Sequence, residues 1–245
     1  MDMASLPRAV ELAMPGARNP RWQPGTAGTT HSEIFAPAAE ASGAGMALAL
    51  ALDGTRALVS QEGQGRAVAD EKAVLWVQDA RARKLGGVPY RPGLPEGLRH
   101  RIVHVAAKTP EDALFALEEG VRCRDLAFVI GELAGNPRGL DFTASRRLTL
   151  AAERHGVPLF LVRLDAGADL SSARMRWRAR AAPSSRPLWN AAAPGRAAWH
   201  AELFRARLHP PGEWVMREDR DGLIAERIDT ADEAAQAGER FRANG

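Results

Sequence analysis

From Glu33 to Leu52 the chain reads EIFAPAAEASGAGMALALAL, which predicts a short strand, a loop of small residues and an apolar helix. This is the order of a phosphate-binding loop, in which backbone N–H groups and a helix N-terminus hold phosphates and one lysine neutralises them. Ser42 and Gly43 stand where the Ser-Gly of such a loop would be. Ala44 then replaces the lysine, and Gly45 replaces the hydroxyl residue that would ligate Mg²⁺. The stretch predicts a nucleotide-binding fold that binds a partner rather than hydrolysing a nucleotide.

The missing lysine has no substitute nearby, because the first lysine of the chain is Lys72. In a working loop that lysine holds the β and γ phosphates. We therefore expect a pseudo-ATPase with no catalytic residues and no metal site. We also expect no cofactor, because the loop disfavours the binding of ATP and Mg²⁺. A simpler interpretation of residues 42–45, a small-residue start to a helix in an alanine-rich protein, remains open.

The amino-acid composition indicates a globular protein with a hydrophobic core. The 245 residues carry 33 Lys and Arg against 30 Asp and Glu, and 45% are hydrophobic, which suffices for a substantial core. The single cysteine, Cys123, excludes an intrachain disulfide and a Cys-based zinc site and is typical of a reducing compartment. The longest apolar run, Met46 to Leu52, is far below the ~20 residues of a membrane span. We expect a cytoplasmic protein without a signal peptide or a membrane partner.

The order of apolar runs predicts an α/β domain over residues 31–228. In its core, residues 31–165, strand-like runs alternate with helical patterns, which is typical of a mainly parallel sheet flanked by helices on both faces. The expected strands are Ser32–Phe35, Ala73–Val77, Arg101–Val105, Leu126–Ile130 and Pro158–Val162, and the expected helices are Gly45–Ser60, Pro110–Arg122 and Phe142–His155.

Beyond the core, strands follow one another without helices, which predicts an antiparallel extension over residues 173–228. Its expected strands are Arg174–Arg180, Trp199–Leu208, Glu213–Glu218 and Leu223–Ile228, with a hairpin turn at residues 219–222. Residues 1–30 are rich in Gly and Pro and are expected to form a flexible N-terminal arm. Residues 229–245 are expected to form a C-terminal tail helix.

The run LAFVIGEL, from Leu126 to Leu133, predicts an apolar strand that ends in an acid, as does a Walker B strand whose carboxylate orients Mg²⁺. Gly131 occupies the usual aspartate position and Glu132 follows one residue later. Glu132 is either a vestigial metal-facing acid or a structural residue with a local partner. Asp79, just after the second expected strand, lies where a general base for water would sit, with the same two interpretations.

A second position superficially suits a phosphate loop, because Lys108 and Thr109 lie between an expected strand and an expected helix. Thr109, Pro110, Glu111 and Asp112 are better explained as a helix N-cap, a proline in the first turn and two acids at the positive helix end. This run therefore predicts a capped helix, not a nucleotide site.

An arginine ladder, defined here as Arg174, Arg176, Arg178 and Arg180, alternates with Met175, Trp177 and Ala179. On a strand this spacing places the guanidinium groups on one face, either a solvated face or a contact surface for DNA or a partner protein. Arg146 and Arg147 extend this candidate patch. Of the C-terminal tryptophans most are expected in the core, while Trp189, in a Pro-flanked segment, is a candidate partner anchor. The six histidines show no metal-ligand spacing.

Several pieces of the sequence together resemble a known family. EIFAP…SGAGMALAL, AVLWVQD, RIVHVAAKTPEDALFALEE and DLAFVIGEL resemble, in that order, the ATPase core of the RecA family. More closely, WVQD, YRPGL, VIGEL, GVPLFLVR, ARMRWRARAAPS, WHAELFRAR and PGEWVMRED resemble the ImuA family, diverged RecA-like proteins of bacterial inducible-mutagenesis cassettes. These pieces span residues 32–218.

The resemblance implies a RecA-like fold and an accessory role in SOS-induced, error-prone translesion DNA synthesis. It implies action with ImuB, a Y-family polymerase homologue, and an error-prone DnaE-type polymerase, with RecA and DNA as further candidate partners. The phosphate-loop and Walker B functions correspond to residues 42–45 and 131–132 in position only, because both motifs are broken. Two alternatives stay open: a DNA-stimulated RecA-type ATPase, and a SulA-like inhibitor of cell division.

Overall fold

The computed structural model describes residues 24, 30–62, 72–187, 190, 192–219 and 222–228, with side chains of 57–62 excepted. The predicted C-terminal tail helix, the candidate anchor Trp189 and all of the predicted N-terminal arm except Pro24 and Thr30 lie outside the described residues.

A single mixed sheet forms the centre of the described chain, with the strand order β3-β2-β4-β5-β1-β6-β7-β8-β9. Pairing is parallel from β3 through to β6 and antiparallel from β6 to β9. The bounds are β1 His31–Ala36, β2 Ala73–Gln78, β3 Ile102–Ala106, β4 Leu126–Ala134, β5 Leu159–Leu164, β6 Met175–Ala181, β7 Ala198–Ala206, β8 Gly212–Glu218 and β9 Leu223–Arg227.

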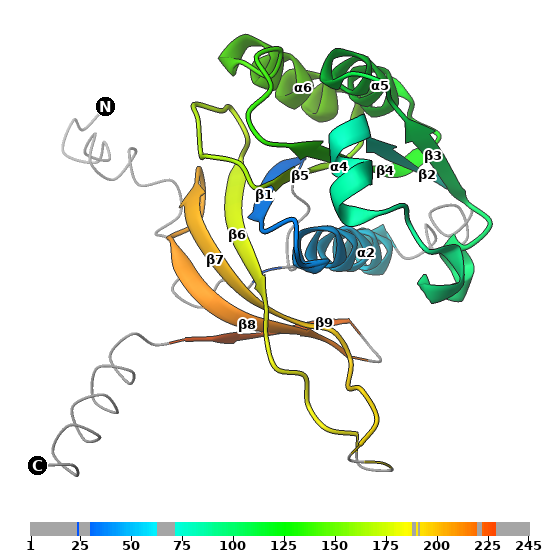
Figure 1. Ribbon diagram of the computed structural model, residues 1–245, viewed down its shortest axis with the longest axis vertical. Helices are drawn as coiled ribbons and strands as arrows, with labels where there is room; N and C mark the ends of the chain where they lie inside the picture. The colour runs from blue at the N-terminus through cyan, green and yellow to red at the C-terminus, as the bar shows by residue number, and fades with distance from the viewer. Residues whose placement is uncertain are drawn as a thin grey trace, which may run out of the picture.

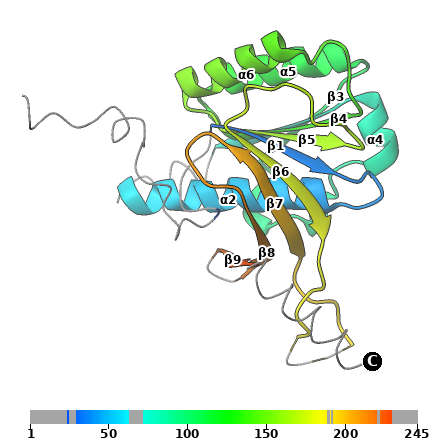
Figure 2. The same cartoon turned by 90° about the vertical axis from the view of Figure 1, so that its left-hand side faces the viewer.

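Helices cover both faces of the parallel half of the sheet. Helices α5 (Pro110–Arg122) and α6 (Phe142–His155) lie side by side on one face, and α2 (Ser42–Glu62) lies on the other (Figures 1 and 2). A short helix, α4 (Ala80–Gly86), follows β2, and two 3-10 turns, η2 (Arg91–Gly93) and η3 (Glu96–Leu98), precede β3. The coarse prediction of a mainly parallel sheet, flanking helices and antiparallel C-terminal strands is confirmed.

The antiparallel strands curl around α2, so that this helix is enclosed between the two halves of the sheet (Figure 1). Trp177 of β6 and Trp214 of β8 are almost fully buried there, with ring centroids 5.9 Å apart in an edge-to-face contact. Asp53 of α2 also accepts a hydrogen bond from the backbone N–H of Leu223 in β9, at 3.0 Å. The prediction that most C-terminal tryptophans belong to the core is confirmed for Trp177, Trp199 and Trp214.

Helix α5 begins with the predicted cap. Thr109 Oγ1 accepts from the N–H of Asp112 at 3.1 Å, and Asp112 Oδ2 accepts from the N–H of Thr109 at 3.2 Å. This reciprocal arrangement satisfies two N–H groups that the first helical turn leaves free. Lys108 and Thr109 therefore start a helix, as expected, and do not form a phosphate loop.

Strand β6 was expected to open a purely antiparallel extension, and this expectation is corrected by its pairing. It lies antiparallel to β7 but parallel to β1, so the extension continues the core sheet without a break. The predicted hairpin between β8 and β9 is present, with Glu218 paired to Leu223. None of the helices among the described residues is long and apolar enough to cross a membrane.

Candidate functional site

The strand, loop and helix predicted between Glu33 and Leu52 are present as β1, residues 37–41 and α2. Residues 42–45, predicted as a loop, form the first turn of α2, and their glycines, Gly43 and Gly45, serve close packing. A Cβ on Gly43 would lie 2.7 Å from Val162 Cγ1 and 2.8 Å from Ala36 Cβ, and one on Gly45 would lie 3.1 Å from the Trp199 ring. The two distances at Gly43 are too short for a real side chain, so this position requires glycine to bring α2 against the sheet, whereas a side chain at Gly45 would need a small shift of the Trp199 ring.

One backbone donor of the loop is already engaged. The N–H of Ala38 donates to Asp165 Oδ1 at 2.9 Å, an acid that follows the neighbouring strand β5. Backbone N–H groups are what a phosphate loop offers its ligand. In this loop a carboxylate of the protein takes the position that an incoming anion would need at Ala38.

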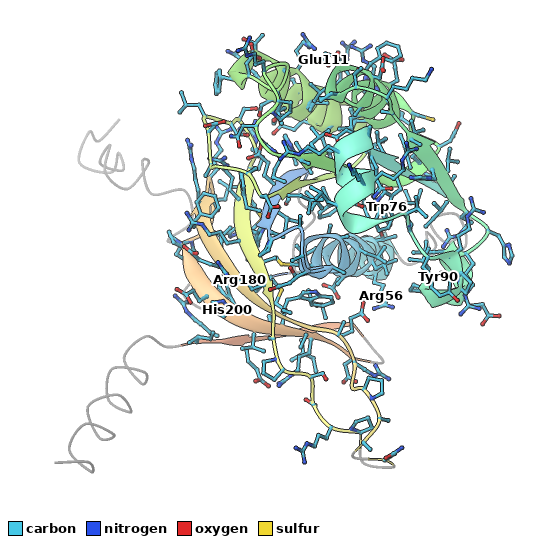
Figure 3. All side chains as sticks on the ribbon, viewed as in Figure 1. Arg56, Trp76, Tyr90, Glu111, Arg180 and His200 are labelled. Carbon is cyan, nitrogen blue, oxygen red and sulfur yellow. The ribbon has the colours of Figure 1, made fainter. Side chains whose placement is uncertain are left out.

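A pocket of about 340 Å³ opens where α2 begins, beside the carboxyl ends of β2 and β4. Its walls come from α2, from these two strands and from the segment that follows α4, and they include Glu40, Ala44, Leu48, Trp76, Gln78 and Glu132. Figure 3 shows Trp76 between α4 and α2, and Tyr90 on the outlying segment after α4. We refer to this cavity as the β2–β4 pocket.

Glu132 is the central polar group of the β2–β4 pocket and is only 4% exposed. Its Oε1 accepts from Trp76 Nε1 at 2.6 Å and from Gln78 Nε2 at 3.1 Å. Burial raises the pKa of the Glu132 carboxyl above its ordinary value. The hydrogen bonds from Trp76 and Gln78 lower this pKa by a smaller amount, and the nearby charge of Asp79 raises it slightly further. Neutral donors therefore hold this carboxylate, without a cation.

Gln78 fixes the geometry around Glu132. Its Nε2 also donates to the carbonyl of Gly87 at 2.9 Å, and its Oε1 bonds His104 Nε2 at 2.9 Å. Burial, followed by the charges of Arg83 and Arg91, lowers the pKa of His104. The neutral imidazole can then donate from Nε2 to Gln78 Oε1, which leaves Gln78 Nε2 to donate toward Glu132.

The ionisable carboxyl groups of the β2–β4 pocket are not balanced by cations of its described lining. Among the described residues that line it, Glu40 and Glu132 are ionisable acids and none is a lysine or an arginine. Ala44, in the predicted lysine position, is part of this wall. The described residues also contain no cluster of three or more His, Cys, Asp or Glu side chains able to hold a metal. Such a wall supplies no positive side chain from the described lining to neutralise the phosphates of a nucleotide.

The two residues of the predicted Walker B end lie on opposite faces of β4. A Cβ on Gly131 would lie 2.7 Å from Leu117 of α5, so this glycine lets α5 pack closely on the sheet. Asp79 is 1% exposed and caps α4, accepting from the N–H of Ala82 at 2.6 Å and from that of Ala134 at 3.2 Å. The structural interpretation of Asp79 holds, because both carboxylate oxygens bond backbone groups.

Arg176 cannot belong to the candidate surface patch, because its side chain is buried and only 3% exposed. Arg176 Nε donates to Glu33 Oε2 at 2.8 Å, and Ser171 Oγ donates to Glu33 Oε1 at 2.8 Å. Arg163 approaches the same carboxylate, with Nη1 3.9 Å from Oε1. The predicted alternation of faces along β6 is correct, but Arg176 is covered by neighbours that include Phe35 and Phe204, whereas Arg178 and Arg180 on the same face are exposed.

Aromatic rings lie against the guanidinium groups of this region. Arg163 and Arg176 lie 5.6 and 5.1 Å from the ring centre of Phe35, and Arg176 and Arg178 lie 5.3 and 4.3 Å from that of Phe204. Cations favour such positions against aromatic faces. We call Glu33, Arg163, Arg176 and Phe35 the buried ion cluster.

The remaining arginines of the candidate patch do not form a continuous basic surface. Arg174 pairs with Glu153 at 2.5 Å, Arg178 with Glu202 at 2.7 Å and Arg147 with Glu118 at 3.3 Å. Arg146 and Arg180 are exposed and make no ion pair with the described residues. Acidic neighbours therefore neutralise much of the positive charge that the sequence places here.

His31 lies beside the buried ion cluster and is fully buried. Its Nδ1 bonds Thr149 Oγ1 of α6 at 2.8 Å, whereas its Nε2 has no hydrogen-bond partner among the described residues. Burial lowers the pKa of His31 to about 4, and Arg174 and Arg176 act in the same direction. The imidazole is therefore neutral at physiological pH.

Glu40, Trp76 and Gln78 are not among the predicted site residues. A polar residue at the end of an otherwise apolar strand, as in AVLWVQ, is the signal that could have found Gln78. Glu40 carries no such signal, because its place in the pocket wall depends on how the loop turns. No protein-family model matches the chain, and no curated protein matches it.

Proposed function

We propose that this chain is a non-catalytic, RecA-like accessory protein in SOS-induced, error-prone translesion DNA synthesis. In this role it recruits or bridges an ImuB-like Y-family polymerase homologue and an error-prone DnaE-type polymerase. The protein acts by binding, and ATP hydrolysis is not part of its work.

The observation that carries the non-catalytic half of the proposal is the charge of the β2–β4 pocket. The pocket lies where a phosphate loop would hold its nucleotide, yet Glu40 and Glu132 line it and the described lining contains no cation. Phosphoryl transfer depends on positive groups that stabilise the charge of the transferred phosphoryl group. A site whose described lining lacks such groups favours the binding of something other than a nucleotide.

The translesion half rests on the sequence pieces that resemble the ImuA family and extend over residues 32–218. The observed α/β sheet supports this assignment, because those pieces fall on successive strands and helices of one continuous sheet. A fold alone does not determine a function. The partners are therefore proposed from the resemblance and need their own experiment.

The nucleotide question is settled by calorimetric titration of ATP with Mg²⁺ into the full chain, at protein concentrations that detect millimolar affinity. We expect no binding heat and no ATP-dependent rise in melting temperature, since a ligand that binds only the folded state raises the apparent stability. Micromolar binding would overturn the non-catalytic proposal and favour the DNA-stimulated ATPase.

The cellular role is tested by deleting the gene and measuring DNA-damage-induced mutation frequency. We expect induced mutagenesis to be lost while cell division stays normal, and the purified chain to retain the ImuB-like protein with or without ATP. Filamentation on overexpression, with induced mutagenesis unchanged in the deletion strain, would instead favour the SulA-like inhibitor.

A further inference from the structure

We propose that the β2–β4 pocket binds the guanidinium group of an arginine side chain presented by a partner protein. This inference rests on the proposed function in one respect, namely that a protein and not a nucleotide occupies the pocket. It adds the chemistry of the contact and the residue that makes it, Glu132.

Glu132 has an oxygen available for a ligand. Oε1 takes both hydrogen bonds, from Trp76 and Gln78, and no hydrogen bond among the described residues uses Oε2. Oε2 faces the Gly86 side of the pocket, since a methyl group on Gly86 would lie 3.8 Å from it. A carboxylate that is 4% exposed and bonded only by neutral donors gains most from a cation in direct contact.

The walls of the β2–β4 pocket suit the rest of an arginine side chain. Leu48, Trp76 and Leu94 offer apolar surface, and Val88 and Tyr90 stand at the rim with 58% and 73% of their surface exposed. Arginine has an aliphatic stem that packs on apolar surface and a planar head that is more weakly hydrated than an ammonium. Both properties favour arginine over lysine in a pocket with largely apolar walls.

The charges point to the same occupant. Glu40 adds a second carboxylate to the wall, its Oε2 being held 2.7 Å from the N–H of Ala181, and the described lining residues include no cation that could pair with Glu132 from within. A metal ion is a poor alternative, because the described residues supply no set of three metal-ligating side chains. An arginine brings one positive charge and up to five donors and needs no further ligands.

The same chain already satisfies one buried carboxylate in this manner. Glu33 receives Arg176 Nε at 2.8 Å, with the guanidinium against the Phe35 ring. Glu132 lacks the corresponding partner within the described residues. The geometry of the buried ion cluster is therefore a template for the contact that we infer in the β2–β4 pocket.

The test uses Nα-acetyl-arginine methylamide as the probe and the Trp76 indole N–H as the reporter. That N–H donates to Glu132 Oε1, so its ¹H–¹⁵N NMR signal, assigned with Trp76→Phe, responds to an occupied carboxylate. We expect a saturable shift with millimolar affinity. The lysine analogue should bind at least threefold more weakly, and the neutral citrulline analogue should not bind.

Two variants and one control complete the test. Glu132→Gln should weaken arginine binding at least tenfold and Glu40→Gln about twofold, while Asp125→Asn should leave it unchanged. Asp125 is exposed and precedes β4, at the strand end away from the pocket, so it is a matched loss of one negative charge. Equal shifts with citrulline, or unchanged affinity in a folded Glu132→Gln protein, would overturn the inference.

An ATP titration on the same sample separates this inference from the proposed function. No response to arginine and none to ATP would overturn the arginine site alone. A saturable response to ATP would overturn the non-catalytic proposal, and the arginine site with it if arginine gives no response.

Discussion

Two buried carboxylates on one sheet have different kinds of hydrogen-bond partner. Glu33, in β1, is 0% exposed and is paired with Arg176 and approached by Arg163. Glu132, in β4, is 4% exposed, and its donors among the described residues are the neutral groups of Trp76 and Gln78. A buried charge with its counterion supplied by the same chain belongs to the framework, whereas one without a counterion is costly to keep, which is why we infer a ligand at Glu132.

Their positions explain the difference. Glu33 lies on the α6 side of the sheet, where β6 continues the sheet and Ser171 reaches the carboxylate from the chain after β5. Glu132 lies on the α2 side, near the end of its strand, where the β2–β4 pocket opens. The Glu33 carboxylate is enclosed by protein and the Glu132 carboxylate borders a cavity. Substituting each by glutamine should therefore change the stability of the protein in different ways.

The largest expected effect is that of Glu33→Gln. The substitution keeps the shape of the side chain but leaves two buried guanidinium groups without their carboxylate. Removing one partner of a buried ion pair costs about 3–5 kcal/mol. We expect a loss of this size in the free energy of unfolding, measured by urea denaturation.

The matched control is Glu202→Gln, which removes the partner of Arg178 from an exposed pair. Exposed pairs contribute about 0–1 kcal/mol, so this loss should be small. Equal effects of the two substitutions would contradict the assignment of Glu33 to the framework.

The next largest effect is the dependence of the free energy of unfolding on pH that is caused by His31. Its pKa falls from 6.5 to about 4 on folding, so the unfolded chain binds the proton more readily. The stability contributed by the neutral imidazole is complete above pH 6.5 and is lost as the pH falls toward 4, by up to about 3 kcal/mol.

Urea denaturation between pH 4 and pH 7 checks this expectation, with His31→Gln as the comparison. The wild-type protein should lose more stability on acidification than the variant does. Parallel pH curves for the two proteins would show that His31 does not titrate as its burial requires.

The smallest effect has the opposite sign. In Glu132→Gln no buried charge remains, and the amide oxygen can still accept from Trp76 and Gln78. Because the pKa of Glu132 is raised in the fold, the wild-type protein loses stability as the pH rises through that pKa, whereas the variant does not. We expect the variant to be more stable at pH 7 by about 0.5–2 kcal/mol, with the gain shrinking in acid.

Thermal or urea unfolding at pH 5 and pH 8 measures that gain. The comparison of the two carboxylates would fail if Glu132→Gln destabilised the protein as Glu33→Gln is expected to do. A gain in stability combined with a loss of arginine binding is the pattern of a ligand site.

Local patterns in the sequence predicted the elements well. Helices α5 and α6 have the predicted bounds, because Thr109 caps α5 and Gly156, with φ 70°, ends α6. Helix α4 was not predicted, since its seven residues are too few to show a periodic pattern. Strand ends coincide with the prediction or differ by up to four residues, and the largest difference is at β4, which pairing with β2 and β5 extends beyond its apolar run to Ala134.

The site was predicted only in part, because its residues meet through the strand order. Glu132 and the loop at residues 42–45 were singled out, but their link through Trp76 and Gln78 depends on β2 lying next to β4. The alternation along β6 predicted which residues share a face with Arg176. What covers that face depends on β1 and Phe35, which lie more than a hundred residues earlier in the chain.

The enclosure of α2 has a consequence for the biosynthesis of the protein. This helix is synthesised well before β9, yet its partners include β9, and the hydrogen bond from Leu223 to Asp53 joins residues 170 apart. Contacts of such long range slow folding, since a long loop must close before they form. The part of α2 that β9 covers therefore stays open until β9 has been synthesised, and a chain truncated before β8 would leave that part exposed as an aggregation-prone surface.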